Sequence, residues 1–313
     1  MKVSVIVCTY NRAGLLKSAI DSILSNSYPD FELVIVDQSD KDETKKLVQK
    51  YISEKPHIRY LWSQRGKSRA LNLGVREAKG EIIAFTDDDC VVSEDWLEKI
   101  AATFDRVTTD SIVVFGSVKI AKHDVRRGFI PANKIRYAEF KGPLSFKKVG
   151  LGGAVGMNMV VRKNFFEKVG YFDEILGPGG ELKACEEYDI TYRALKKGFK
   201  IIHIPTIEVE HHGFRTWKEG KLLFEHYIIG TVGTFCKHIR CMDFDALLLL
   251  LVSFFYDLVE YTKLLVTLRP TFFALLYDLL FMYGIYFISF LKGIIKSVKF
   301  VIDKKNMIYL VET

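Results

Sequence analysis

Three consecutive aspartates, Asp87, Asp88 and Asp89, are the side chains of this sequence that point most clearly to chemistry. They follow an apolar run at 81–85, which predicts a buried strand. Adjacent carboxylates repel one another, and a hard cation such as Mn²⁺ or Mg²⁺ relieves that repulsion through oxygen ligands. If the chain stays extended, Asp87 and Asp89 face the same side and Asp88 faces away. The triplet therefore predicts either a divalent metal site or a solvated acidic turn.

Two further polar segments lie nearer the N-terminus, each at the end of an apolar run. Thr9, Tyr10 and Arg12 combine the start of an amphipathic stretch with a cation, which favours phosphate binding or simply caps a helix. Asp37 closes the second apolar run, where it can accept hydrogen bonds from a base or ribose, or form an Asx turn. Lys67 belongs to a small basic group that can meet phosphate or remain solvated. These residues are candidates for binding a phosphate-bearing ligand.

The first 110 residues alternate between apolar runs of strand length and amphipathic stretches of helical spacing. The expected strands are 3–8, 33–36, 58–62 and 81–85, and the expected helices are 15–24, 42–54, 68–79 and 97–104. This alternation predicts an α/β fold with a mostly parallel, doubly wound sheet and flanking helices. Ligands bind beyond the carboxyl ends of the strands in such sheets. The polar clusters follow those ends, which favours a shared binding site over unrelated turns.

The composition changes sharply after residue 243. The segments 246–262 and 271–291 are mostly apolar, and the second holds one charged side chain, Asp278. A bilayer-spanning helix needs about 20 apolar residues, so these segments predict a helical hairpin in the membrane or helices lying in its interface. A helical packing or dimerisation element is the alternative. The basic residues that flank the region, as at a cytoplasmic membrane surface, are Lys292, Lys296, Lys299, Lys304 and Lys305.

The overall composition excludes several classes of protein. The formal net charge of +7 suits a phosphate-bearing substrate or an anionic membrane surface, but the basic residues are too scattered to predict nucleic-acid binding. Hydrophobic residues make up 49% of the chain, which is enough for a packed core and argues against wholesale disorder. The five cysteines are irregularly spaced, without a Cys-x-x-Cys pair. We therefore expect a reducing compartment, without a disulfide framework or zinc site.

The ordered succession of these segments resembles family 2 glycosyltransferases, which have the GT-A fold. It is carried by Val-Ile-Val-Cys-Thr-Tyr-Asn-Arg at 5–12, Val-Ile-Val-Asp-Gln-Ser at 34–39 and the stretch 69–89 that ends in the aspartate triplet, and it covers 2–212. The resemblance implies a nucleotide-sugar donor that is UDP-, GDP- or dTDP-linked, and inversion at the anomeric carbon. It also implies Mn²⁺ or Mg²⁺ as cofactor.

The resemblance also assigns roles to individual residues. The donor-binding residues are expected to be Thr9, Tyr10, Arg12, Asp37, Lys67, Asp87 and Asp88. In the family's Asp-x-Asp motif, Asp87 takes the ribose side and Asp89 binds the metal, whereas Asp88 is the more structural of the three. His211 ends a strand where the family often has a metal ligand, and a surface histidine pair is the alternative interpretation.

Glu187 is the expected catalytic base, because it occupies the position where the family usually has an Asp after a Glu. The longer side chain leaves Glu186 and Asp189 as rivals. A charged helix start favoured by the helix dipole is the alternative for any of the three. Family members that build polymers processively carry a Gln-x-x-Arg-Trp motif, which Phe-Arg-Thr-Trp at 214–217 does not match. A single-transfer, non-processive enzyme is therefore expected.

These assignments predict a hexosyltransferase-type enzyme at the cytoplasmic face of the cell membrane. It would move a sugar to an acceptor hydroxyl of a cell-surface saccharide or lipid-linked intermediate by metal-assisted direct displacement. A nucleotidyltransferase of related fold and a catalytically inactive membrane-associated scaffold are the alternatives. The expected organisation is a GT-A catalytic domain over 1–215 (nucleotide-sugar half 1–110, acceptor half 111–215), a helical connector over 216–242 and an apolar helical membrane-associated region over 243–313.

Overall fold

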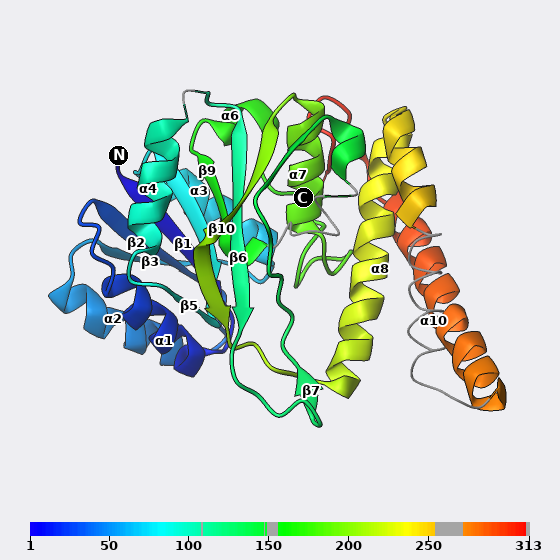
Figure 1. The fold of residues 1–313 in the computed structure, drawn as a ribbon, viewed down its shortest axis with the longest axis horizontal. Coiled ribbons are helices and arrows are strands. Elements are labelled where there is room, and N and C mark those ends of the chain that lie inside the picture. Colours follow the sequence, from blue (N-terminus) through cyan, green and yellow to red (C-terminus); the bar gives the residue numbers. More distant parts are fainter. Residues whose placement is uncertain (108, 147, 149–155, 254–271, 311–313) are drawn as a thin grey trace.

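The computed structural model describes residues 1–313 except 108, 147, 149–155, 254–271 and 311–313. A nine-stranded mixed sheet runs through its centre in the order β3-β2-β1-β4-β9-β6-β10-β5, with β8 paired to β10 (Figure 1). Helices cover both faces of this sheet. The predicted mixed, mostly parallel sheet with flanking helices is confirmed.

Four parallel strands form the N-terminal half of the sheet. They are β1 (Val3–Thr9), β2 (Phe31–Asp37), β3 (Ile58–Trp62) and β4 (Ile82–Asp87). Every residue of β1 is buried, as expected of a parallel strand between two layers of helices. The register pairs Thr9 with Asp37 and Cys8 with Asp87. The polar residues that end these strands therefore lie along one edge of the sheet.

The helices divide between the two faces of the sheet. One face is covered by α1 (Ala13–Leu24), α2 (Glu43–Glu54) and α4 (Trp96–Arg106), and the other by α3 (Lys67–Glu77), α6 (Phe165–Val169), α7 (Glu186–Lys196) and α8 (Trp217–Arg240). The strands supply both cores because successive side chains point to opposite faces. In β1, Val5 and Val7 join the first core, whereas Ile6 and Cys8 join the second.

The other half of the sheet has mixed strand directions. It contains β5 (Cys90–Val92), β6 (Ile112–Ile120), β8 (Ala138–Lys141), β9 (Met159–Arg162) and β10 (Lys200–His211). β9 runs antiparallel between β4 and β6, while β10 is parallel to β6. β5 pairs antiparallel with β10 and places Cys90 opposite His211. This pairing brings the end of β10 beside the aspartate triplet.

Short elements connect these strands. They are β7 (Gly128–Phe129), paired with β11 (Arg215–Thr216), and the 3₁₀ helices η1 (Pro143–Ser145) and η2 (Gly156–Asn158). A capping box starts α8: Thr216 accepts from the backbone of Glu219, and the Glu219 side chain accepts from the Thr216 backbone. The sequence predicted this segment to be helical but not how it packs. Ile228, Val232 and Phe235 of α8 are buried in the core shared with α7.

The described residues of the C-terminal region form helices and a hairpin beside the sheet (Figure 1). Residues 244–253 are helical, α10 (Phe272–Val298) packs along α8, and β12 (Ile302–Asp303) pairs with β13 (Ile308–Tyr309). Across the described ranges, no helix is both long and apolar enough to span a bilayer. The predicted apolar segment 246–262 lies partly outside the described residues, so the membrane association of this region stays a prediction.

Candidate active site

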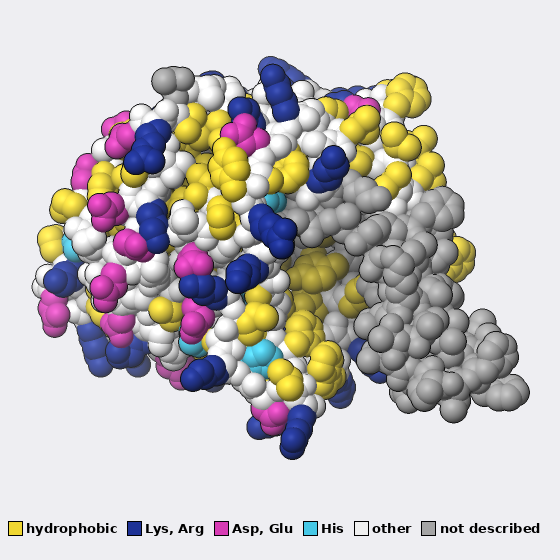
Figure 2. All heavy atoms as spheres, in the orientation of Figure 1, with side chains coloured by type: hydrophobic (Ala, Val, Ile, Leu, Met, Phe, Trp, Pro, Cys, Tyr) yellow, Lys and Arg dark blue, Asp and Glu magenta, His cyan; other side chains and the backbone are white. Residues whose placement is uncertain are grey.

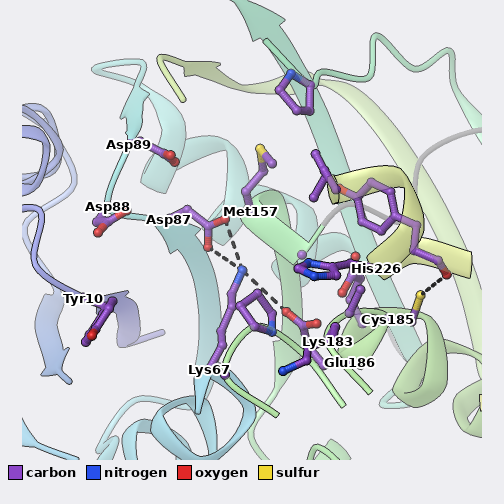
Figure 3. Close-up of a pocket in the computed structure, with 18 of the residues that line it drawn as sticks. Tyr10, Lys67, Asp87, Asp88, Asp89, Met157, Lys183, Cys185, Glu186 and His226 are labelled. Atoms are coloured by element: carbon purple, nitrogen blue, oxygen red, sulfur yellow. Dashed lines mark hydrogen bonds and ion pairs between the residues drawn. The ribbon is translucent and has the colours of Figure 1, made fainter. Parts of the chain in front are cut away.

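A cavity of 590 Å³ opens at the carboxyl ends of β1 and β4 and is bounded by residues of α7 and α8 (Figure 3). The predicted site residues that line it are Tyr10, Arg12, Lys67, Asp87, Asp88, Asp89, Glu187 and His211. Two others lie outside this lining. Thr9 is buried behind it, where its hydroxyl donates to Asp88 at 2.7 Å. Asp37 lines a neighbouring cavity.

The three carboxylates of the aspartate triplet form ion pairs with two different basic residues. Asp87 ends β4, and its Oδ1 lies 2.9 Å from Lys67 Nζ. Asp88 and Asp89 both contact Nη1 of Arg12, at 3.2 Å and 2.9 Å. The chain turns at Asp88 and Asp89 instead of staying extended. The expected alternation of side-chain direction is therefore wrong, because the turn brings Asp88 and Asp89 to the same guanidinium.

Asp89 and His211 form the candidate metal centre. Both side chains are buried, and His211 Nε2 lies 3.3 Å from Asp89 Oδ1. The two atoms are close enough to be ligands of one ion. His211 Nδ1 faces the carbonyl of Pro131, which leaves Nε2 for the metal. A Cβ on Gly213 would lie 2.5 Å from Asp89 Oδ2, so glycine keeps open the space beside the pair.

The charges around this centre fit a divalent cation. Burial would raise the pKa of Asp89, but His211 and Arg12 outweigh burial and hold that pKa at about 2, so the carboxylate stays ionised. Burial raises the pKa of Asp88 to about 6, against the charge of Arg12. A potential ligand atom of Cys90 lies within 4.8 Å of those of Asp89 and His211. Burial keeps Cys90 a thiol by raising its pKa. Against burial, Asp89 raises the pKa of His211, so a bound ion would displace a proton from this imidazole. The carboxylate and imidazole are then ligands suited to Mn²⁺ or Mg²⁺.

The start of α7 carries the candidate base. Glu186 is buried, and its Oε1 lies 3.5 Å from Lys67 Nζ, so this lysine joins α7 to Asp87 (Figure 3). Burial alone would lower the pKa of Lys67, but Asp87 and Glu186 raise it and the lysine stays charged. Burial and repulsion from Glu186 raise the pKa of Glu187 well above its ordinary value. A carboxylate with a raised pKa is suited to accept a proton near neutral pH.

The rival base Asp189 is held in a buried ion network. Its carboxylate lies 2.9 Å from Arg193 Nε, 2.6 Å from Lys237 Nζ and 3.0 Å from His238 Nε2, and these side chains are fully buried. Burial opposes ionisation, but the charges of Lys237 and Arg193 outweigh it and lower the pKa of Asp189. Asp189 is not among the described residues that line the cavity. The candidate bases are therefore narrowed to Glu186 and Glu187.

Tyr10 and Arg65 form another wall of the cavity. Arg65 Cζ lies 4.7 Å from the centroid of the Tyr10 ring, a cation–π contact. Asp37 is buried and accepts hydrogen bonds from the backbone N–H of Ser39 and the hydroxyl of Tyr60, both at 2.9 Å. Asp37 thus forms the Asx turn that was its alternative interpretation. It also lines the neighbouring cavity of 530 Å³, which Arg65 shares with the main one.

The loop before α7 is fastened to the start of α3. The backbone N–H of Lys67 donates to the carbonyl of Pro178 at 2.9 Å, and the hydroxyl of Ser68 donates to the carbonyl of Leu176 at 2.8 Å. A Cβ on Gly179 would come within 3.0 Å of Cα of Gly66. Glycine at these positions therefore lets the two segments of the chain approach closely. These contacts hold the loop before α7 against the start of α3.

The family model described as Glycosyl transferase family 2 matches residues 4–170, more than half of the chain. The chain belongs to this family. It is 28% identical over 184 residues to the glycosyltransferase AglE of Haloferax volcanii. The matched residues are 58% of this chain and 59% of that protein. It is also 38% identical over 91 residues to a GalNAc(5)-diNAcBac-PP-undecaprenol beta-1,3-glucosyltransferase of Campylobacter jejuni. The matched residues are 28% of this chain and 29% of that protein.

The chain matches its curated relatives over about three fifths of their length or less. Among solved structures, S. aureus TarS 1–349 in complex with UDP-GlcNAc is similar with a TM-score of 0.53 and 24% sequence identity, over 67% of this chain and 58% of that chain. The likeness supports the GT-A fold. The predicted membership of family 2 glycosyltransferases is confirmed.

Part of the lining of the cavity could not be foreseen from motifs. Lys183, Arg215, His226 and Tyr227 also line it. Arg215 Nη2 lies 4.0 Å from Asp89 Oδ2 and adds a further cation near the candidate metal centre. His226 and Tyr227 come from α8, the segment expected to be a connector. The capping box of α8 shows where this helix begins. Nothing local in the sequence shows which face of α8 meets the cavity.

Proposed function

We propose that this glycosyltransferase moves a sugar from a UDP-, GDP- or dTDP-linked donor to an acceptor hydroxyl, in single transfers and with inversion. The observation that carries the proposal is that the Asp89–His211 pair and Glu187 line one cavity from separate elements. A carboxylate and an imidazole can hold a cation on the donor diphosphate, while a second carboxylate takes a proton. The TarS complex with UDP-GlcNAc supports a nucleotide-sugar donor, and the Campylobacter jejuni relative supports a lipid-linked saccharide acceptor.

In the proposed reaction, Glu187 accepts the proton of the acceptor hydroxyl while the hydroxyl oxygen bonds to the anomeric carbon. The bond from that carbon to the donor phosphate oxygen breaks on the opposite face, so the nucleoside diphosphate leaves and the configuration inverts. General-base assistance of this kind is worth about 10²–10⁴-fold. Asp89 and His211 would hold Mn²⁺ or Mg²⁺, which neutralises charge on the diphosphate when bound. Lys67 holds Asp87 and Glu186 in place across the cavity.

The proposal is tested by incubating the full chain with Mn²⁺ and a panel of UDP-, GDP- and dTDP-sugars, and by measuring released nucleoside diphosphate. We expect release from at least one donor, its loss in Asp89→Asn, and donor binding without turnover in Glu187→Gln. Near-normal turnover of Glu187→Gln would indicate that Glu186 is the catalytic base instead. Pyrophosphate as product would favour the nucleotidyltransferase alternative. Failure of every nucleoside diphosphate to bind would favour the inactive scaffold.

We also propose that the enzyme works at the cytoplasmic surface of a membrane. The supporting observation is a group of exposed apolar side chains at the start of the C-terminal region. The exposed fraction is 74% for Met242 and for Phe244, 49% for Leu248 and 48% for Leu251. Figure 2 shows hydrophobic side chains gathered at the upper right, where helix 244–253 lies in Figure 1. Helices that lie in a membrane interface bury such residues among lipid headgroups.

A further inference from the structure

The wall of the cavity that faces the aspartate triplet carries two residues that the proposed reaction does not use, Lys183 and His226. Lys183 belongs to the loop before α7, and His226 belongs to α8. Figure 3 shows both on the side of Glu186, across the cavity from Asp88 and Asp89. They therefore lie on the acceptor side of the site, away from the metal centre.

The backbone at Lys183 is held in an unusual conformation. Its φ is 67° and that of Cys185 is 73°, both in the left-handed region that residues other than glycine rarely adopt. Such residues persist only where surrounding contacts enforce them, and they concentrate at ligand sites. Here the residues on either side of Lys183 are held by backbone hydrogen bonds, of 2.9 Å from the Leu182 N–H to the Ile175 carbonyl and of 3.2 Å from the Gly177 N–H to the Ala184 carbonyl. A braced loop thus presents Lys183 to the cavity.

The ammonium of Lys183 has no carboxylate or aromatic partner in the part of the chain that the structure describes. The other cations of the cavity have partners: Asp88 and Asp89 for Arg12, Asp87 and Glu186 for Lys67, Asp89 for Arg215, and the ring of Tyr10 for Arg65. Burial and the charge of Lys183 lower the pKa of His226, so this imidazole is neutral near pH 7. A free ammonium beside a neutral imidazole offers donors for an anion.

We infer that Lys183 and His226 form a subsite for a phosphate group of the acceptor, close to the hydroxyl that Glu187 activates. This inference rests on the proposed function. The donor diphosphate is assigned to the metal centre at the opposite wall, so an anion at Lys183 is a second group. Leu223 and Tyr227 line the cavity beside His226, and they give the phosphate an adjoining apolar wall. Lysine binds phosphate as a point charge, and a ring N–H adds direction.

A purely structural role for Lys183 would be to neutralise the glutamates at the start of α7. The distances argue against this role, because Lys67 Nζ is the ammonium that lies 3.5 Å from Glu186. Burial and Glu186 raise the pKa of Glu187 despite the charge of Lys67, so this carboxylate is not fully compensated. If Lys183 served the glutamates, its replacement would change turnover without changing phosphate affinity. The two roles are therefore separable by a binding measurement.

The test uses the full chain saturated with Mn²⁺ and whichever of UDP, GDP or dTDP binds best, so that the donor site is filled. Octyl phosphate is then titrated against octanol, and glycerol 1-phosphate against glycerol. We expect a phosphate probe to bind more tightly than its alcohol, and Lys183→Gln to weaken that binding by about tenfold or more, with nucleoside diphosphate affinity unchanged. A preference for octyl phosphate identifies a lipid-linked phosphate, and a preference for glycerol 1-phosphate identifies a soluble one.

Two variants serve as controls. Lys183→Arg keeps the charge and should retain phosphate binding. Lys197→Gln removes an exposed lysine outside the described cavity lining and should behave as the wild type. Equal affinity for each phosphate and its alcohol, or unchanged phosphate affinity in Lys183→Gln, overturns the inference. Failure of every nucleoside diphosphate to bind would instead overturn the proposed function, so the two failures are distinguishable.

Discussion

Gly213 packs against the proposed metal ligands, and adding one methyl group there is expected to abolish metal binding. In Gly213→Ala the new Cβ would lie 2.5 Å from Asp89 Oδ2 and closer still to His211 Nε2. Both contacts are shorter than a Cβ makes with other atoms, so the Asp89 and His211 side chains would have to shift. The φ of Gly213 lies outside the left-handed region, so alanine suits the backbone there. The backbone of the variant should therefore keep its conformation, while the displaced Asp89 and His211 side chains lose Mn²⁺.

The size of the loss follows from the proposed role of the cation. Removing one electrostatic contact to developing charge in a buried site costs about 3–4 kcal/mol of transition-state stabilisation, which corresponds to about 10²–10³-fold in rate. We expect Gly213→Ala to lower Mn²⁺-dependent kcat/KM by a factor in that range. The assay measures nucleoside diphosphate release as a function of Mn²⁺ concentration, and the Tm with and without Mn²⁺ reports metal binding independently of turnover.

Gly284→Ala is the matched control, because a Cβ at Gly284 would meet no heavy atom within 4 Å. It should leave both kcat/KM and the Mn²⁺-dependent rise in Tm unchanged. If Gly213→Ala keeps wild-type activation by Mn²⁺ and the wild-type rise in Tm, the assignment of Asp89 and His211 as ligands is refuted. The Tm without Mn²⁺ shows whether the added methyl group harms the fold itself.

Three further changes test the base, the core and the membrane surface. Glu187 acts only when deprotonated, so kcat should fall as the pH drops through its raised pKa. Glu186→Gln removes the charge repulsion on Glu187 and should move this fall in kcat to lower pH. An unchanged pH profile of kcat would show that another residue is the base. Lys237→Met leaves two buried aspartates without their shared cation and should lower the free energy of unfolding in urea by about 3–5 kcal/mol, whereas a loss below about 1 kcal/mol would contradict the network. Phe244→Ser should weaken cosedimentation with anionic vesicles. If the variant and the wild type bind these vesicles equally, the helix 244–253 does not contact the membrane.

The donor half of the site could be predicted because its signals are local. Buried runs of β-branched residues predicted β1 to β4, and parallel pairing determines which strand ends share an edge. The proximity of Arg12 to the aspartate triplet follows from this topology. The direction of each carboxylate does not, because the turn at Asp88 and Asp89 depends on contacts with Thr9 and Arg12, far earlier in the chain.

The acceptor wall could not be predicted, because long-range packing builds it. Lys183 reaches the cavity only because its loop is fastened to α3, and His226 only because α8 packs against the core beside α7. Asp189 illustrates the same limit. In the sequence it is one of three acidic residues at a helix start, and only its burial among Arg193 and Lys237 separates it from Glu187.

The buried ion network joins the candidate base to the C-terminal region. Lys237 of α8 lies 2.6 Å from both Asp189 of α7 and Asp173, and Asp173 also accepts the backbone N–H of Tyr309 in β13 at 2.8 Å. Charges removed from water must stay paired, so separating these elements would expose or orphan a buried ion. Asp189 stands two residues after Glu187 on α7, and the network therefore fixes the helix start that carries the candidate base. The C-terminal region proposed to meet the membrane thus also supports the geometry of the active site.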